Sequence, residues 1–270
     1  MEYSLGEVRT KGFTMEYMKF GSGGGTLVIL PGLSLTRVLL AAPAVVRRYE
    51  LFAEDFTVYV FERRSDLPKV YSVEDMARDT ADAMESLGLS GVNLFGASQG
   101  GMIAMLIAAE RSGLVKKLIL GSTALCADEK RIETIGEWVR LARSGDRESL
   151  CLSFGEKVYP RAVFEENRAA FSTMAKMTTD GDIGRFIVLA EGTRGFSAEG
   201  FADKITCPVM VMGDTSDEVL GAEAAKELCE KFKGRDGFES CIYSGFGHAA
   251  YDTAPDFPRR MYDFIKENNT

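Results

Sequence analysis

The stretch Val92-Asn93-Leu94-Phe95-Gly96-Ala97-Ser98-Gln99-Gly100 decides the fold. A short apolar run passes through a G-x-S-x-G sequence into a segment rich in alanine, methionine and leucine that extends to about Arg111. We expect a buried strand, a sharp turn and a helix, because this context presents a serine as a nucleophile. The glycines on both sides of Ser98 would give the tight turn the small residues it needs. The alternative is that Ser98 is an ordinary helix N-cap.

The only histidine in the 270 residues is His248. A serine hydroxyl is a poor nucleophile until a base takes its proton, and near neutral pH that base is usually a histidine. If a histidine of this chain activates Ser98, it must therefore be His248. It lies in a glycine-flanked loop after the apolar segment from Glu239 to Tyr243, and we expect it to be catalytic.

An acidic residue is expected to orient His248, and the chain order Ser, Asp or Glu, His places it after the preceding strand. The sequence there reads Gly213-Asp214-Thr215-Ser216-Asp217-Glu218. We favour Asp217, because it is set off from the strand and precedes the next helix. Asp214 is the alternative and Glu218 the third candidate. Asp217 could instead only cap that helix.

Apolar runs alternate with helical segments along most of the chain, which predicts an α/β fold. The expected strands are 13–20, 26–30, 56–61, 92–95, 118–120, 209–212 and 239–243. The expected helices are 72–87, 98–111, 221–232 and 257–266. Continuous apolar runs are typical of strands buried on both faces, so we predict a mostly parallel central sheet with helices on both faces.

The alternation stops between residues 125 and 198, where the sequence indicates helices at 128–144, 147–158, 161–177 and 183–191. We expect a helical cap or lid insertion there, dividing a core domain into residues 1–124 and 199–270. An insertion between two parallel strands would lie near the ends of those strands, where ligands bind in such sheets. The apolar residues of the insertion are expected mainly to pack the cap on the core, and a few to contact substrate.

These motifs and their order resemble the α/β-hydrolase superfamily. The resemblance implies a serine hydrolase with a helical cap, a Ser-His-Asp triad and no metal or organic cofactor. It also implies an oxyanion hole formed by the backbone N–H groups of Leu33 and Gln99. The chain departs from the family at Pro31-Gly32-Leu33, where His-Gly is usual, and at residues 61–66, which lack the glycines of the family's Asp-x-Arg-Gly run.

The leading hypothesis is hydrolysis of a small ester, thioester or related acyl substrate. The alternatives are a carbon–carbon bond hydrolase, lyase or perhydrolase with the same triad, and a small-molecule-binding relative without catalysis. Dehalogenases and epoxide hydrolases are disfavoured because they place an aspartate where Ser98 stands. Ser34, Arg37 and Trp138 are candidate substrate-binding residues, although Arg37 is more simply explained as a solvated surface residue.

The amino-acid composition excludes several kinds of partner and site. The chain has 32 Lys and Arg against 40 Asp and Glu, a net charge of -8, which argues against a nucleic-acid partner. The five cysteines are irregularly spaced with no CxxC pair, so we expect reduced thiols. No apolar run approaches the roughly 20 residues of a membrane span, and the first seven residues resemble no signal peptide. We therefore expect a cytoplasmic protein that binds a small molecule; the oligomeric state is left open.

Overall fold

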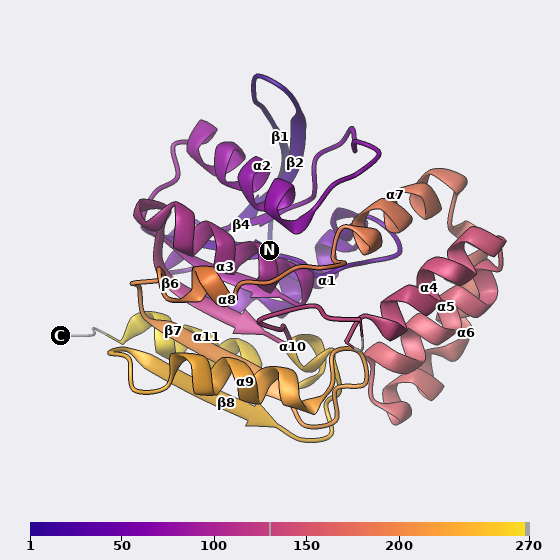
Figure 1. Cartoon of the computed structure of the whole chain (residues 1–270). Coiled ribbons are helices and arrows are strands. Elements are labelled where there is room, and N and C mark those ends of the chain that lie inside the picture. The colour runs from indigo at the N-terminus through magenta and orange to yellow at the C-terminus, as the bar shows by residue number, and fades with distance from the viewer. Residues whose placement is uncertain (130, 268–270) are drawn as a thin grey trace.

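A computed structural model describes residues 1–129 and 131–267. Its centre is an eight-stranded sheet in the order β1-β2-β4-β3-β5-β6-β7-β8 (Figure 1). The strands are β1 (Tyr3–Arg9), β2 (Thr14–Phe20), β3 (Gly25–Leu30), β4 (Phe56–Phe61), β5 (Val92–Ala97), β6 (Val115–Gly121), β7 (Val209–Asp214) and β8 (Phe238–Tyr243). Only β2 runs against the others, since it pairs antiparallel with both β1 and β4. The predicted mostly parallel sheet is confirmed.

Strand β1 was not predicted, and its exposure explains why. It lies at the edge of the sheet, and Val8 is its only buried residue. A strand that is solvated on most of its surface has no continuous apolar run to reveal it. The seven predicted strands all form, several of them one to four residues longer than expected.

The helices are α1 (Ala42–Arg48), α2 (Val73–Ser86), α3 (Gln99–Glu110), α4 (Glu133–Ser144), α5 (Arg147–Val158), α6 (Arg161–Met177), α7 (Asp180–Glu191), α8 (Glu199–Ala202), α9 (Ala222–Phe232), α10 (Ala250–Thr253) and α11 (Phe257–Lys266). Ser72 caps α2, and its side chain accepts a hydrogen bond from the Asp75 N–H. The apolar run of residues 38–46 favours a core segment, and the structure contradicts this in part, since only Ala42 and Val46 are buried. Val38–Ala41 forms a 3₁₀ turn without a buried residue, and Leu40 is 74% exposed.

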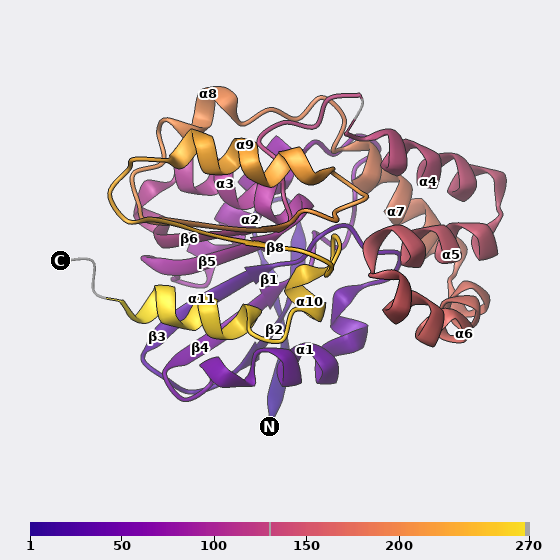
Figure 2. The same cartoon turned by 90° about the horizontal axis from the view of Figure 1, so that it is seen from below.

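Alternate residues of the central strands face two separate cores, because successive side chains of a strand point to opposite sides. Leu30 of β3 packs in the core that includes α2, α3 and α9, whereas Ile29 packs in the core that includes α1 and α11. Helices therefore cover both faces, as Figure 2 shows with α9 on one side of the sheet and α11 on the other.

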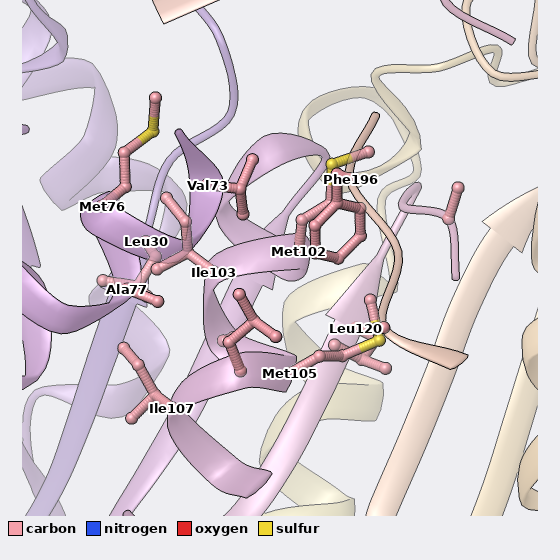
Figure 3. Close-up of a cluster of buried hydrophobic side chains, with 14 of the residues drawn as sticks. Leu30, Val73, Met76, Ala77, Met102, Ile103, Met105, Ile107, Leu120 and Phe196 are labelled. Carbon is pink, nitrogen blue, oxygen red and sulfur yellow. The ribbon is translucent and has the colours of Figure 1, made fainter. Parts of the chain in front are cut away.

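Helix α3 is apolar all round because it is enclosed by the sheet and other helices. Figure 3 shows Met102, Ile103 and Met105 of α3 among side chains of α2, β3 and β6. This packing fixes the helix that begins one residue after Ser98. None of the helices in the described ranges has both the length and the apolar character to cross a membrane.

The predicted helical insertion is confirmed as α4–α7, which follows β6 and lies beside the sheet (Figure 1). Its two ends are tied together. The Ala127 N–H donates to the Phe196 carbonyl at 2.8 Å, and the Ala198 N–H donates to the Leu125 carbonyl at 2.8 Å. The insertion is thus joined to the sheet by a short paired stalk.

Candidate active site

The turn at Ser98 is strained and is held from several sides. Ser98 has φ 51° and ψ -120°, a conformation rarely adopted by a residue with a side chain, between the end of β5 and the start of α3. Its N–H donates to the Gly121 carbonyl at 2.8 Å, and its carbonyl accepts from the Thr123 hydroxyl at 2.7 Å. The Ser98 side chain does not cap α3, so the N-cap alternative is wrong.

The two flanking glycines are required by close backbone approach. A Cβ added to Gly96 would lie 2.3 Å from the Gly100 carbonyl oxygen, and one added to Gly100 would lie 2.0 Å from the Leu30 carbonyl oxygen. Neither contact is possible between real atoms, and neither neighbour is a flexible side-chain end. The first turn of α3 can therefore lie directly against β3 only because these residues have no side chain.

Replacing Gly100 by alanine is expected to destabilise the fold. Overpacking of this kind costs about 1–3 kcal/mol, which corresponds to a fall in melting temperature of roughly 3–10 °C for a chain of this size. The matched control is Gly113→Ala, because no atom lies within 4 Å of a Cβ there and Gly113 is exposed. Calorimetry of the two variants should separate them; equal melting temperatures would contradict the contact geometry.

His248 connects Ser98 with Asp217. Its Nε2 lies 2.9 Å from Ser98 Oγ, and its Nδ1 lies 2.8 Å from Asp217 Oδ2. All three side chains are at least nine-tenths buried. An ionised carboxylate only accepts hydrogen bonds, so Nδ1 must carry the ring proton and Nε2 is left to accept the Ser98 hydroxyl proton. This arrangement is the one in which an imidazole can act as a base toward a serine.

Two opposing effects set the pKa of Asp217. Burial raises this pKa. The charge of His248 lowers it, as do the hydrogen bonds from His248 and from the N–H groups of Val219 and Leu220. The net result is a pKa below the ordinary value of an aspartate. Those N–H groups lie 2.8 and 2.9 Å from Asp217 Oδ1. The carboxylate is therefore ionised at neutral pH and can stabilise a positive charge on the ring.

The other two acids of this loop do not approach His248. Asp214 ends β7, and its carboxylate accepts from the N–H groups of Ser216, Gly245 and Phe246 at 2.6, 3.2 and 2.8 Å. It holds the two loops against each other. Glu218 forms an ion pair with Lys157 of α5 at 2.8 Å. Of the three acids, only Asp217 contacts His248, while Asp214 connects the two loops through their backbone N–H groups.

Leu33 and Gln99 belong to the two backbone segments that adjoin Ser98. Gly32, which precedes Leu33, is so near that a Cβ built on it would lie 3.6 Å from Ser98 Oγ. Gln99 is the first residue of α3, where N–H groups have no partner within the helix. Among the residues that the structure describes, no acceptor is bonded to either N–H. Both N–H groups are thus without a backbone acceptor in the described part of the chain.

The Gln99 side chain has a separate connection that sequence reasoning missed. Its Nε2 donates to the Leu189 carbonyl at 2.7 Å and to Thr193 Oγ1 at 2.8 Å, at the end of α7 and just beyond it. On the other side, Arg63 donates to the Pro31 carbonyl at 2.8 Å and to Gln99 Oε1 at 3.4 Å. Burial lowers the pKa of Arg63 to about 10. These contacts join the insertion and the loop before Leu33 to the start of α3.

A cavity of about 470 Å³ lies beside this site, between the core and the insertion. It is mainly apolar. The residues at the Ser98 end include Gly32, Leu33 and Ala97, and the insertion contributes Phe154, Val158, Tyr159, Phe171 and Met174. Its size and lining suit a small organic molecule.

The three candidate substrate-binding residues have different positions. Ser34 and Arg37 line the cavity, but the Ser34 hydroxyl donates to the Thr36 carbonyl and Arg37 forms an ion pair with Glu16. Trp138 is outside the cavity lining and is 2% exposed. Its ring packs on Phe154 with centroids 4.8 Å apart. The expectation that Trp138 contacts substrate is therefore corrected, because the insertion uses the ring for its own packing.

The cysteines and acids suggest no metal centre. All five cysteines are free. Within residues 1–129 and 131–267, no group of three or more His, Cys, Asp or Glu side chains is placed to hold a metal ion.

The fold and the site together define an α/β protein with a serine–histidine–aspartate arrangement at the end of its central strands. The sequence model of the alpha/beta hydrolase fold family matches residues 25–255, and the chain belongs to this family.

Known proteins resemble parts or all of the chain. Serine hydrolase BPHL from Mus musculus is 28% identical over 149 residues, which are 51% of this chain and 51% of the relative. The chain thus spans about half the length of the curated relatives it matches.

Two solved structures match this chain over nearly its whole length. MGS-M2, an alpha/beta hydrolase from a Medee basin deep-sea metagenome library, has a TM-score of 0.85 and 16% identity, with 97% of this chain and 98% of that chain covered. A thermophilic esterase from Thermogutta terrifontis has a TM-score of 0.79 and 17% identity, with 99% and 100% covered. Identities this low show a shared fold only.

Proposed function

We propose that the protein is a serine hydrolase that cleaves a small ester, thioester or related acyl substrate through an acyl-enzyme. The observation that carries this proposal is the unbroken contact from Ser98 Oγ through His248 to Asp217, at 2.9 and 2.8 Å. The kinship with the alpha/beta hydrolase fold family and the partial match to a protein named serine hydrolase support it.

In the first half of the reaction, Ser98 Oγ attacks the carbonyl carbon while its proton passes to His248 Nε2. The carbonyl oxygen becomes negatively charged and is stabilised by the N–H groups of Leu33 and Gln99. Asp217 stabilises the positive charge on the ring. When the intermediate collapses, the bond to the leaving group breaks, and His248 delivers its proton to the departing oxygen or sulfur.

In the second half, water attacks the acyl group on Ser98, and His248 takes the proton of that water. The second intermediate collapses with release of the acid, and the proton returns to Ser98 Oγ. In this proposal residues 125–198 act as a cap that excludes bulk water and lines the acyl or alcohol side of the substrate. The cavity volume of about 470 Å³ favours small substrates.

Labelling with a fluorophosphonate, read out by intact mass, tests the nucleophile. We expect one adduct on the wild-type protein and none on Ser98→Ala. His248→Ala should remain unlabelled on the same time scale, because its serine lacks a base. An unlabelled wild-type protein that turns over no ester would contradict the proposal and favour the non-catalytic alternative.

If the wild-type protein is labelled but turns over no ester or thioester, a panel of diketones becomes the next assay. Products of carbon–carbon cleavage would replace the acyl-hydrolase proposal by the alternative with the same triad.

A further inference from the structure

The cavity contains one carboxylate that the proposed reaction does not use. Asp252 belongs to α10, four residues after His248, and lines the cavity together with Tyr49, Tyr159 and Tyr251. Its side chain is exposed, and the space beside it is the cavity. It thus offers an accessible negative charge within a space that is otherwise mainly apolar.

The Asp252 carboxylate has no partner of its own. In the described part of the chain, no hydrogen bond or ion pair involves its side chain. Arg48 is the cation that acts on it, but the Arg48 guanidinium donates to the carbonyls of Tyr251 and Ala254 at 2.9 and 2.7 Å. Loss of hydration raises the pKa of Asp252 to about 6, although Arg48 opposes the change. The carboxylate is therefore mostly ionised at pH 7.5, and its negative charge faces the cavity.

Three tyrosines line the same cavity as this carboxylate. Burial raises the pKa values of Tyr49, Tyr159 and Tyr251, and the charge of Asp252 adds to this effect, so the three hydroxyls stay protonated. Aromatic rings attract cations through their electron-rich faces, and a carboxylate adds direct charge attraction. The other charged residue of the cavity wall, Arg37, is paired with Glu16. Arg48 therefore acts on Asp252 through its charge, without a hydrogen bond to the carboxylate.

We propose that Asp252, Tyr49, Tyr159 and Tyr251 form a subsite for a positively charged nitrogen, such as the ammonium group of an amine-bearing substrate. The proposal rests on the proposed function in so far as this group would belong to an ester or thioester attacked by Ser98. A ligand of this kind supplies the direct hydrogen-bond donor that the Asp252 carboxylate lacks within the described residues, and it adds to the positive charge that Arg48 places nearby. An anionic substituent at the same position would be repelled.

The test compares benzylammonium with benzyl alcohol, which are similar in size and differ in charge. Their affinities are measured at pH 7.5 by ligand-observed NMR with wild-type protein, Asp252→Asn and Asp263→Asn. Asp263 is an exposed acid of α11 outside the cavity lining, and its substitution changes the net charge equally. We expect wild type and Asp263→Asn to bind benzylammonium about tenfold more tightly than benzyl alcohol, and Asp252→Asn to bind them about equally.

If the wild-type protein bound benzylammonium and benzyl alcohol equally well, the proposal would be overturned without any variant. The proposal therefore remains falsifiable even if Asp252→Asn folds poorly. A loss of preference in Asp263→Asn as large as that in Asp252→Asn would also overturn it, because the preference would then reflect net charge. Binding is measured without turnover. A chain that prefers benzylammonium but hydrolyses no ester would contradict the proposed function only, and an active chain without the preference would contradict the subsite only.

Discussion

Ser98→Ala is expected to lower kcat/KM for a small activated ester by about 10⁴-fold or more, while the protein remains folded. The reason is that no other side chain is placed to attack: Ser98 Oγ lies 2.9 Å from His248 Nε2, and the chain has no second histidine. Alanine removes only one oxygen atom and keeps the Cβ at φ 51°, so the strain of the turn is retained. Initial rates with p-nitrophenyl acetate, together with circular dichroism, provide the measurement.

Ser122 offers a matched control for this substitution. It is also buried, at 2% exposed, it also has a positive φ, of 44°, and it lies directly after β6, the strand beside β5. Its hydroxyl has no hydrogen-bond partner within the described residues. Ser122→Ala should therefore retain kcat/KM within about threefold. If kcat/KM fell as far in Ser122→Ala as in Ser98→Ala, the loss of either buried serine would abolish activity. The result for Ser98→Ala would then not identify Ser98 as the nucleophile.

Asp217→Asn is expected to lower kcat by about 10⁴-fold, while the asparagine oxygen can still accept from the Val219 and Leu220 N–H groups. An asparagine has nearly the same shape, but it is neutral and can present its N–H₂ group to His248 Nδ1. The ring would then carry its proton on Nε2, where it can no longer accept the Ser98 proton. The measurement is kcat from the dependence of the initial rate on ester concentration; a fall of less than tenfold would contradict a role for Asp217 in orienting and charging the ring.

Asp214→Asn is the corresponding control, because it is expected to affect thermal stability more than kcat. Its carboxylate accepts three backbone N–H groups but does not contact His248. Loss of charge-assisted hydrogen bonds costs about 1.5–3 kcal/mol, or roughly 3–10 °C in melting temperature for a chain of this size. We expect a clear loss of thermal stability and a smaller loss of kcat than in Asp217→Asn. If Asp214→Asn were the more damaging for kcat, the alternative assignment of the acid would be preferred.

Much of the fold could be predicted because its physical causes are local in the sequence. Strands buried on both faces require continuous apolar runs, and β3, β4, β5 and β7 have them. The sharp turn requires glycines at fixed positions, and Gly96 and Gly100 are present. The approach of Ser98 to His248, 150 residues apart, could be expected because only one histidine exists.

Other features depend on contacts that no local pattern records. The choice between Asp217 and Asp214 is decided by loop geometry, since β7 continues through Asp214 and the N–H groups around that residue occupy its oxygens. Trp138 could not be assigned to packing or to substrate until its neighbours in the insertion were known. The contacts of Arg63 and Gln99 join three separate segments of the chain. The only sequence signal for these contacts was the pair Arg63 and Arg64, which follows a buried strand.

The single imidazole of this chain also gives the site its own spectroscopic label. In most enzymes, histidine resonances must be assigned by substitution before any of them reports on catalysis. Here ¹⁵N-histidine incorporation marks two ring nitrogens, one facing Asp217 and the other facing Ser98. Their chemical shifts can therefore follow tautomer, protonation and acylation in the unaltered protein during turnover, with no background signal to subtract.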